Sequence, residues 1–134
     1  MTLKDKIQVI PRHLLKDERG WFLKVITGKE DGLPNYTGEV YITVGLQGQK
    51  KGGHFHRLTK EWFTLIEGDA ILKLEDIVTN ERIELPLTLE DAITVVVPPN
   101  VAHEFVNNGN SRFVVVAYAD QSYIPSDTIS YTIK

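Results

Sequence analysis

Two stretches decide the fold: GQKKGGHFHRLTKEWFTLIEG at residues 48–68 and PPNVAHEFVN at residues 98–107. In the first stretch, His54 and His56 lie two residues apart, so their imidazoles share one face of a strand. Glu61 follows His56 after four intervening residues, and the second stretch adds His103. Three neutral imidazoles and one carboxylate suit Zn²⁺, Fe²⁺, Mn²⁺ or Ni²⁺, and are a poor donor set for Ca²⁺ or Mg²⁺. We therefore expect these four residues to bind a divalent metal ion, with zinc as the first candidate.

The chain has 134 residues and no cysteine, with 15 basic residues, 18 acidic residues and four histidines. That length suits one domain, so we expect residues 1–134 to form a single domain. The lack of cysteine excludes disulfide scaffolds, thiolate zinc sites and cysteine nucleophiles. The acidic balance argues against a nucleic-acid binder. No apolar run approaches the ~18 residues of a membrane span, and the first residues lack a signal-peptide core, so we expect a cytoplasmic protein that binds no membrane.

Apolar residues recur at period two along most of the chain, and this pattern predicts strands. The runs of β-branched and aromatic residues predict strands at 21–26, 39–44, 61–67, 70–77, 93–97 and 112–119. Turn signals rich in Gly, Pro, Asn and Asp separate these runs. No segment of helical length has a clear 3.6-residue period; residues 85–91 come nearest and are too short. The sequence therefore predicts an all-β protein, a small barrel or jelly roll.

The two ends of the chain carry weaker strand signals. Residues 7–10 predict an edge strand that Pro11 closes, and residues 129–133 predict a final strand. Because uncovered terminal strands invite pairing with a second subunit, we expect a homodimer. The fourth histidine, His13, has no partner in the sequence, and we interpret it as a structural residue.

The two stretches resemble the two sequence motifs of the cupin family. The first motif matches Gly48, His54, His56, Glu61 and Gly68, and the second, at residues 92–107, matches Pro98, His103 and Asn107. The second motif departs at Ala92 and Asn100, where the family has glycines. Because asparagine tolerates a positive φ, Asn100 can still make the turn. The resemblance implies an all-β, single-domain cupin, which is a double-stranded β-helix or jelly-roll barrel; some cupins keep fragments of these motifs without a metal.

A closer resemblance is to enzymes that act on nucleotide-linked sugars. Residues 17–22, DERGWF, resemble the Asp-x-Arg-Gly-x-Phe segment of the dTDP-4-dehydrorhamnose 3,5-epimerases, and residues 51–54, KGGH, resemble their Arg-Gly-x-His segment. The length and the paired histidines also resemble the dTDP-4-keto-6-deoxyglucose 3,4-ketoisomerases. Residues 51–127 are similar to the C-terminal cupin domain of a capsular-polysaccharide UDP-4-keto-sugar reductase/epimerase. At Lys24 the 3,5-epimerases tend to carry glutamate, so dTDP- and UDP-linked substrates both stay open.

These resemblances imply an isomerase, either an epimerase or a ketoisomerase of a nucleotide-linked 4-keto-6-deoxy hexose in polysaccharide or deoxysugar biosynthesis. Such a reaction needs a base for an α-proton and a group that stabilises the enolate. The candidate catalytic residues are His54, Tyr41, Tyr118 and Tyr123, and the candidate substrate-binding residues are Arg19, Phe22 and Lys51. Imidazole suits the base and tyrosine the proton donor, the two cations suit a pyrophosphate, and Phe22 or its neighbour Trp21 can stack on the nucleotide base. The plain alternatives are a solvated turn for Arg19 and ordinary core packing for the aromatic residues.

Three questions stay open at this level. A metal ion on His54 would occupy a ring nitrogen that a base needs, so His54 is either a ligand or the base. The same donor set also fits an iron-dependent cupin dioxygenase. A non-catalytic sugar-binding module is the third possibility, since the similar cupin domain is one part of a two-domain enzyme.

Overall fold

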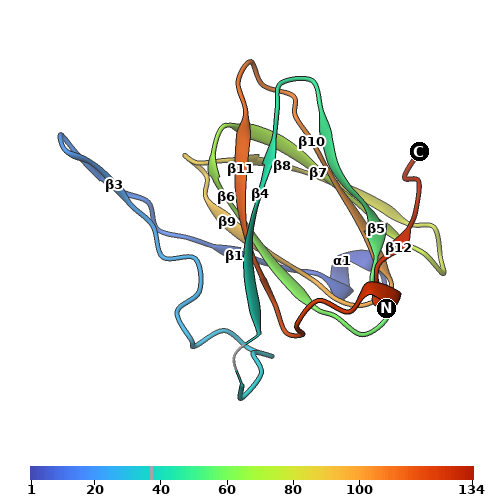
Figure 1. Cartoon of the computed structure of the whole chain (residues 1–134). Coiled ribbons are helices and arrows are strands. Elements are labelled where there is room, and N and C mark those ends of the chain that lie inside the picture. The colour runs from blue at the N-terminus through green and yellow to red at the C-terminus, as the bar shows by residue number, and fades with distance from the viewer. Residues whose placement is uncertain (37) are drawn as a thin grey trace.

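Two five-stranded sheets face each other in the computed structural model, which describes residues 1–36 and 38–134 (Figure 1). The elements are α1 (Leu3–Lys6), β1 (Gln8–Pro11), β2 (Leu15–Asp17), β3 (Gly20–Phe22), β4 (Glu39–Gly45), β5 (Lys50–Phe55), β6 (Glu61–Glu67), β7 (Asp69–Asp76), β8 (Arg82–Thr88), β9 (Ile93–Val97), β10 (Val101–Val106), β11 (Phe113–Ala119), the 3-10 turn η1 (Pro125–Asp127) and β12 (Ile129–Ser130). The first sheet has the order β1-β9-β6-β11-β4 and the second the order β12-β5-β10-β7-β8. From β4 to β7 and from β8 to β12 the chain crosses from one sheet to the other at each step, and neighbouring strands are antiparallel. This is an all-β jelly roll, as the sequence predicts.

The core lies between the two sheets and explains the period of two. Phe63 on β6 and Val115 on β11 point inward from the first sheet, and Leu72 and Leu74 on β7 point inward from the second; each is at most 1% exposed. Successive side chains of a strand point to opposite faces, so each strand contributes every second residue to this core.

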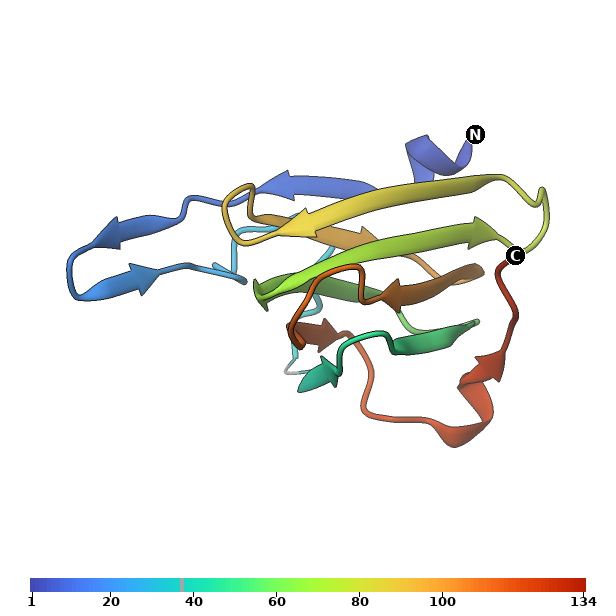
Figure 2. The same ribbon diagram turned by 90° about the horizontal axis from the view of Figure 1, so that it is seen from above.

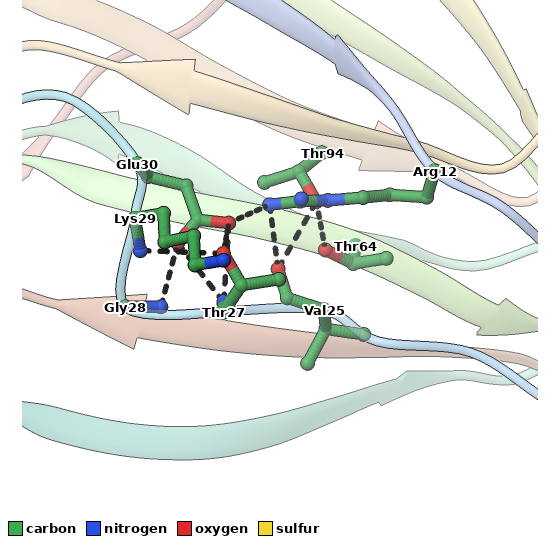
Figure 3. A network of polar contacts seen from close by, with 8 residues as sticks. All are labelled: Arg12, Val25, Thr27, Gly28, Lys29, Glu30, Thr64 and Thr94. Atoms are coloured by element: carbon green, nitrogen blue, oxygen red, sulfur yellow. Dashed lines mark hydrogen bonds and ion pairs between the residues drawn. The ribbon is translucent and has the colours of Figure 1, made fainter.

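Strand β6 is buried on its outer face as well, because the segment Val25–Glu30 covers it (Figure 3). Arg12 holds this segment in place: its Nη2 donates to the Glu30 carboxylate at 2.7 Å and to the Val25 carbonyl at 2.9 Å. Its Nε donates to Thr94 Oγ1 on β9 at 2.7 Å, and this hydroxyl is 2.7 Å from that of Thr64 on β6. Burial alone would raise the pKa of Glu30, but Arg12 and the groups around Thr27 outweigh it and lower the pKa to about 2.

The same network corrects one prediction. The apolar run at residues 21–26 predicts a strand, but β3 ends at Phe22 and residues 23–26 have no strand pairing. The carbonyl of Val25 accepts from Arg12 instead of a neighbouring strand. Trp21 and Phe22 are exposed on the β2-β3 hairpin, and Val25 and Ile26 lie against the outside of the first sheet without joining it.

Except for the last one, the other strands predicted by range form within one residue of their expected bounds. Strands β2 and β8 have no counterpart among the predictions, and β8 falls where the sequence has only a weak helix-like pattern. The motif residues His54 and His103 lie on β5 and β10. Asn100 has a φ of 67°, so it makes the glycine-like turn expected of it. The final strand is shorter than predicted, since only Ile129 and Ser130 pair with β5.

Strand β1 is an edge strand that ends at Pro11, as predicted, and it pairs with β9. Within the part of the chain that the structure describes, no helix has the length and apolarity needed to cross a membrane.

Candidate functional site

A cavity of about 250 Å³ opens between the two sheets. Strands β4, β5 and β6, the loop that precedes β6 and the segment after β11 supply its walls. The side chains that line it are those of Glu39, Tyr41, His54, His56, Thr59, Glu61, Ala119, Gln121, Ser122, Tyr123, Ile124 and Thr128. The cavity therefore contains most of the predicted metal ligands and two of the three predicted tyrosines.

The three motif histidines meet at this cavity. His54 on β5 is the register partner of His103 on β10, and their ring centroids are 4.7 Å apart. One ring nitrogen from each of His54, His56 and His103 lies within 4.8 Å of the others. Gly52 makes this approach possible, because it has a φ of 99° and a Cβ there would lie 2.9 Å from the carbonyl oxygen of His103.

Glu61 completes the cluster, from the first residue of β6. Its Oε1 is 2.9 Å from Nε2 of His56 and 3.6 Å from Nε2 of His103, and its Oε2 accepts a 2.5 Å hydrogen bond from the Tyr41 hydroxyl. Burial raises the pKa of this carboxyl, but His56, His103 and Tyr41 outweigh burial, so the net shift is downward. Burial and the Glu61 charge raise the pKa of Tyr41, so its hydroxyl stays protonated as the donor.

The three imidazoles have different electrostatic surroundings. Burial lowers the pKa of His103 to about 4, so this ring is neutral at pH 7. Burial, followed by the neighbouring His56, also lowers the pKa of His54. For His56, burial acts downward, but the Glu61 carboxylate and the Asp127 carbonyl outweigh it and raise the pKa. His54 is therefore a neutral, partly exposed imidazole that can accept a proton from a molecule in the cavity.

The cluster fits a divalent metal ion. Although His56 Nε2 and Glu61 Oε1 are only 2.9 Å apart, neither has a hydrogen-bond partner of acceptable geometry among the described residues. Buried polar atoms without a partner are costly, and two such atoms that converge on one point are typical of metal ligands. The nitrogen and carboxylate donors match a transition metal such as zinc.

Four predicted site residues lie elsewhere. Arg19 and Phe22 belong to the β2-β3 hairpin, which projects away from the two sheets (Figure 2), and both are exposed. Lys51 is exposed on β5 and does not line the cavity. Tyr118 points to the outer face of the first sheet, where it packs against Trp62 and its hydroxyl accepts from the Gly38 N–H.

The sequence analysis misses two acidic residues at the site. Glu39 lines the cavity and accepts a 2.7 Å hydrogen bond from the Tyr123 N–H. Asp127 is 4% exposed, and its carbonyl accepts from Nδ1 of His56 at 2.9 Å. Nothing in the local pattern marks Asp127, because its partners lie about 70 residues away along the chain.

Comparisons with known proteins place the chain among proteins of sugar metabolism. Residues 15–131 match the family described as the polysaccharide biosynthesis C-terminal domain. The chain is 27% identical over 114 residues to a UDP-2-acetamido-2,6-beta-L-arabino-hexul-4-ose reductase of Pseudomonas aeruginosa. That alignment covers 85% of this chain and 28% of the reductase, so the chain spans less than a third of that relative's length.

Solved structures of two dTDP-sugar enzymes and of a capsular polysaccharide assembling protein share the fold. A dTDP sugar isomerase from Desulfovibrio desulfuricans superposes with a TM-score of 0.87 at 17% identity, over 96% of this chain and 85% of that one. A dTDP-6-deoxy-D-glucose-3,5-epimerase from Legionella pneumophila, in complex with dTDP-4-keto-L-rhamnose, has a TM-score of 0.82 at 18% identity, over 96% and 74% of the two chains. The capsular polysaccharide assembling protein CapF of Staphylococcus aureus has a TM-score of 0.68 at 23% identity, over 90% of this chain and 34% of that one.

Proposed function

Because the chain belongs to the polysaccharide biosynthesis C-terminal domain family, we propose that it is an epimerase or ketoisomerase of a nucleotide-linked 4-keto-6-deoxy hexose. The observation that carries the proposal is the neutral imidazole of His54 in a cavity that Tyr123 also lines. The occurrence of the same fold in a dTDP sugar isomerase and a 3,5-epimerase supports the choice of substrate class.

The chemistry uses groups that line the cavity. A ring nitrogen of His54 takes the proton from the carbon next to the sugar ketone, and the electron pair of the broken C–H bond moves through the new C=C bond onto the carbonyl oxygen. Tyr123 returns a proton to the same carbon from the other face, which inverts its configuration. Since Tyr123 is 66% exposed and His54 is partly exposed, water can then carry the proton from His54 to the Tyr123 phenolate, which restores both groups. Return of the proton to the former carbonyl carbon, with loss of the neighbouring hydroxyl proton, gives the shifted ketone instead.

We assign His56, Glu61 and His103 as ligands of a divalent metal ion, preferably zinc, and keep His54 as the base. Of the three histidines, only His54 has no ring nitrogen within 4 Å of a Glu61 carboxylate oxygen. His54 is also less buried than His103. When bound, the ion supplies positive charge that stabilises an enolate oxygen.

Metal analysis of the purified protein tests this assignment. His56→Ala or Glu61→Ala should remove most of the bound metal, because losing one of few ligands weakens a site severely. His54→Gln should retain it. Loss of metal in His54→Gln, or full metal content in both alanine variants, would contradict the assignment.

Deuterium exchange tests the proposed reaction. The protein is incubated in deuterated water with dTDP- and UDP-linked 4-keto-6-deoxy hexoses, and the recovered sugars are examined by mass spectrometry and NMR. We expect deuterium at C3 or C5 with at least one substrate, and none with His54→Gln. Binding of these sugars without exchange in the wild-type protein would point to a sugar-binding module and sink the enzymatic proposal.

We also propose that the chain forms a homodimer in which the β2-β3 hairpin of one copy completes the cavity of the other. Among the described residues, no lysine or arginine lines the cavity, although a diphosphate needs a cation. The hairpin carries Arg19 and Phe22 outward, and among the described residues the Arg19 guanidinium pairs only with its neighbour Asp17. An apolar stripe of Val40, Ile42 and Val44 on edge strand β4 is 64%, 63% and 39% exposed and offers a contact surface.

A mixing experiment distinguishes a hairpin that binds at the cavity of the other copy from one that binds at the cavity of its own chain. Arg19→Ala and His54→Gln proteins are each expected to be inactive, but mixed dimers contain one site with an intact His54 and an intact Arg19 from the other copy. If the copies exchange freely, we expect about a quarter of the wild-type activity in the mixture. No recovery after denaturation and joint refolding would contradict the shared site.

A further inference from the structure

The four-residue linker between His56 and Glu61 has no strand partner, and two aspartates of the C-terminal segment bind all of its backbone N–H groups. The donors are Arg57 and Leu58 to Asp127 Oδ1 at 2.8 and 2.9 Å, Thr59 to Asp127 Oδ2 at 3.1 Å, and Lys60 to Asp120 Oδ1 at 2.9 Å. Irregular backbone of this kind is fixed only by such contacts, since it has no ladder of its own.

Further bonds tie the same two aspartates to the linker. The Thr59 hydroxyl donates to Asp127 Oδ2 at 2.6 Å, and the Asp120 N–H donates to the Lys60 carbonyl at 3.0 Å. The carbonyl of Asp127 accepts from Nδ1 of His56 at 2.9 Å. Asp127 thus fixes the linker through its side chain and the imidazole of His56 through its main chain.

Between these two aspartates, the chain forms part of the cavity wall. Gln121, Ser122, Tyr123 and Ile124 line the cavity, and the segment begins at Asp120 and ends at Asp127, both of which hold residues 57–60. The position of this wall and the spacing of His56 and Glu61 are therefore set by the same hydrogen bonds.

We propose that Asp127 and Asp120 are positioning residues, which set the orientation of His56 and its distance from Glu61, and so couple the substrate-facing wall to the catalytic cluster. The inference rests on the proposed function for its catalytic meaning. Charge-assisted hydrogen bonds from backbone N–H groups to a buried carboxylate are among the stronger ones, which suits a fixed support of this kind. Asp127 makes more of these bonds than Asp120, so it should matter more.

Side-chain NMR of the four histidines, in metal-stripped protein at a fixed pH, tests the positioning without any substrate. In Asp127→Asn, an NH₂ group replaces the carboxylate oxygen that accepts from Thr59. The chemical shifts of the backbone amides of residues 57–60 and of the ring ¹⁵N atoms of His56 should therefore change. Those of His13 should stay. Asp120→Ala should give smaller shifts in the same signals. Leu58→Ala is the matched control, because it trims an exposed side chain of the same linker and leaves every one of these bonds in place.

Kinetics on the exchange reaction give the second readout. We expect Asp127→Asn to lower kcat about 10- to 100-fold with little change in KM, the usual effect of removing a group that orients a site residue. Leu58→Ala should match the wild type. If His56 signals in folded Asp127→Asn and Asp120→Ala equal those of the wild type, the positioning role is overturned, whatever the activity. If the wild type shows no exchange, the proposed function fails while the NMR result still decides the positioning.

Discussion

Glu61 is the residue on which the most groups of the site converge. It lies 3% exposed between two imidazoles and the Tyr41 hydroxyl, so its charge is compensated from three directions. Buried carboxylates need such partners, since an unpaired buried charge is costly. Replacing any of these partners should therefore lower the free energy of unfolding as well as the catalytic rate.

Tyr41→Phe tests this at a single atom. It removes the hydroxyl that donates to Glu61 Oε2 and keeps the ring, so we expect the free energy of unfolding to fall by about 1–3 kcal/mol. Urea denaturation measures the change. Tyr123→Phe is the control, because that ring is 66% exposed, and its stability should equal that of the wild type. Equal stability of both variants would contradict the role assigned to the Tyr41–Glu61 bond.

His103 should make the metal-stripped protein less stable in acid. Its pKa is about 4 in the folded state, against 6.5 for an unperturbed histidine, so between these values the unfolded chain binds a proton that the folded chain does not. Stability is therefore lost as pH falls from 6.5 towards 4, at about 1.4 kcal/mol per pH unit where the difference is one full proton. The raised pKa of His56 acts in the opposite sense.

Urea denaturation at successive pH values isolates the His103 contribution when His103→Gln is measured beside the wild type. The variant has no histidine to protonate at this position, so its stability should not fall for this reason in acid. The difference between the free energies of unfolding of the wild type and the variant should therefore become smaller as the pH falls from 6.5 to 4. A gap that stays constant from pH 7 to pH 4 would show that His103 is not held neutral by burial.

At the scale of elements, the Arg12–Glu30 ion pair holds the segment that covers the outer face of β6. The two side chains are 9% and 3% exposed, and together they fasten the segment Val25–Glu30 over the outer face of the first sheet. Arg12→Met leaves the Glu30 carboxylate buried without its partner, which should cost roughly 3–5 kcal/mol of stability. Trp62, now 1% exposed, should become accessible to acrylamide quenching in a Trp21→Phe background. Unchanged quenching would contradict the covering role.

Strand prediction works where alternation reflects the core and fails where another element competes for the backbone. In the strands predicted at residues 39–44 and 112–119, burial alternates because one face packs between the sheets, and β4 and β11 form within one residue of those bounds. The run at residues 21–26 is also apolar, but its first two residues belong to the projecting hairpin, and the Val25 carbonyl bonds to Arg12 outside the first sheet. A side-chain to backbone bond from a distant arginine leaves no local pattern to read.

At the scale of the whole molecule, the two sequence motifs predict that the histidines and Glu61 meet. His54 and His103 are register partners on β5 and β10, and Glu61 reaches them from β6 of the facing sheet. Asp127 and Glu39 could not, since each acts through a partner that only the tertiary fold supplies. Arg19 and Phe22 are predicted at the site but lie away from it. The resemblance implies that they bind the substrate, but in one chain they lie on a projecting hairpin. The proposed homodimer would reconcile the two, so its test is also a test of the substrate site.

Ile42→Lys tests that state through the apolar stripe on β4. Ile42 is 63% exposed, and a lysine buried there in a subunit interface would be unpaired. If the proposed dimer forms, the wild type should have twice the mass of one 15.2 kDa chain, and the variant should be a monomer. Size exclusion with light scattering measures the mass. Val78→Lys is the matched control, since Val78 is an apolar residue, 77% exposed, outside the stripe, and that variant should remain a dimer.

If the hairpin completes the cavity of the other copy, Ile42→Lys should also lose the exchange activity that Val78→Lys keeps. A monomeric wild type with full activity would instead show that one chain binds the diphosphate without a second copy.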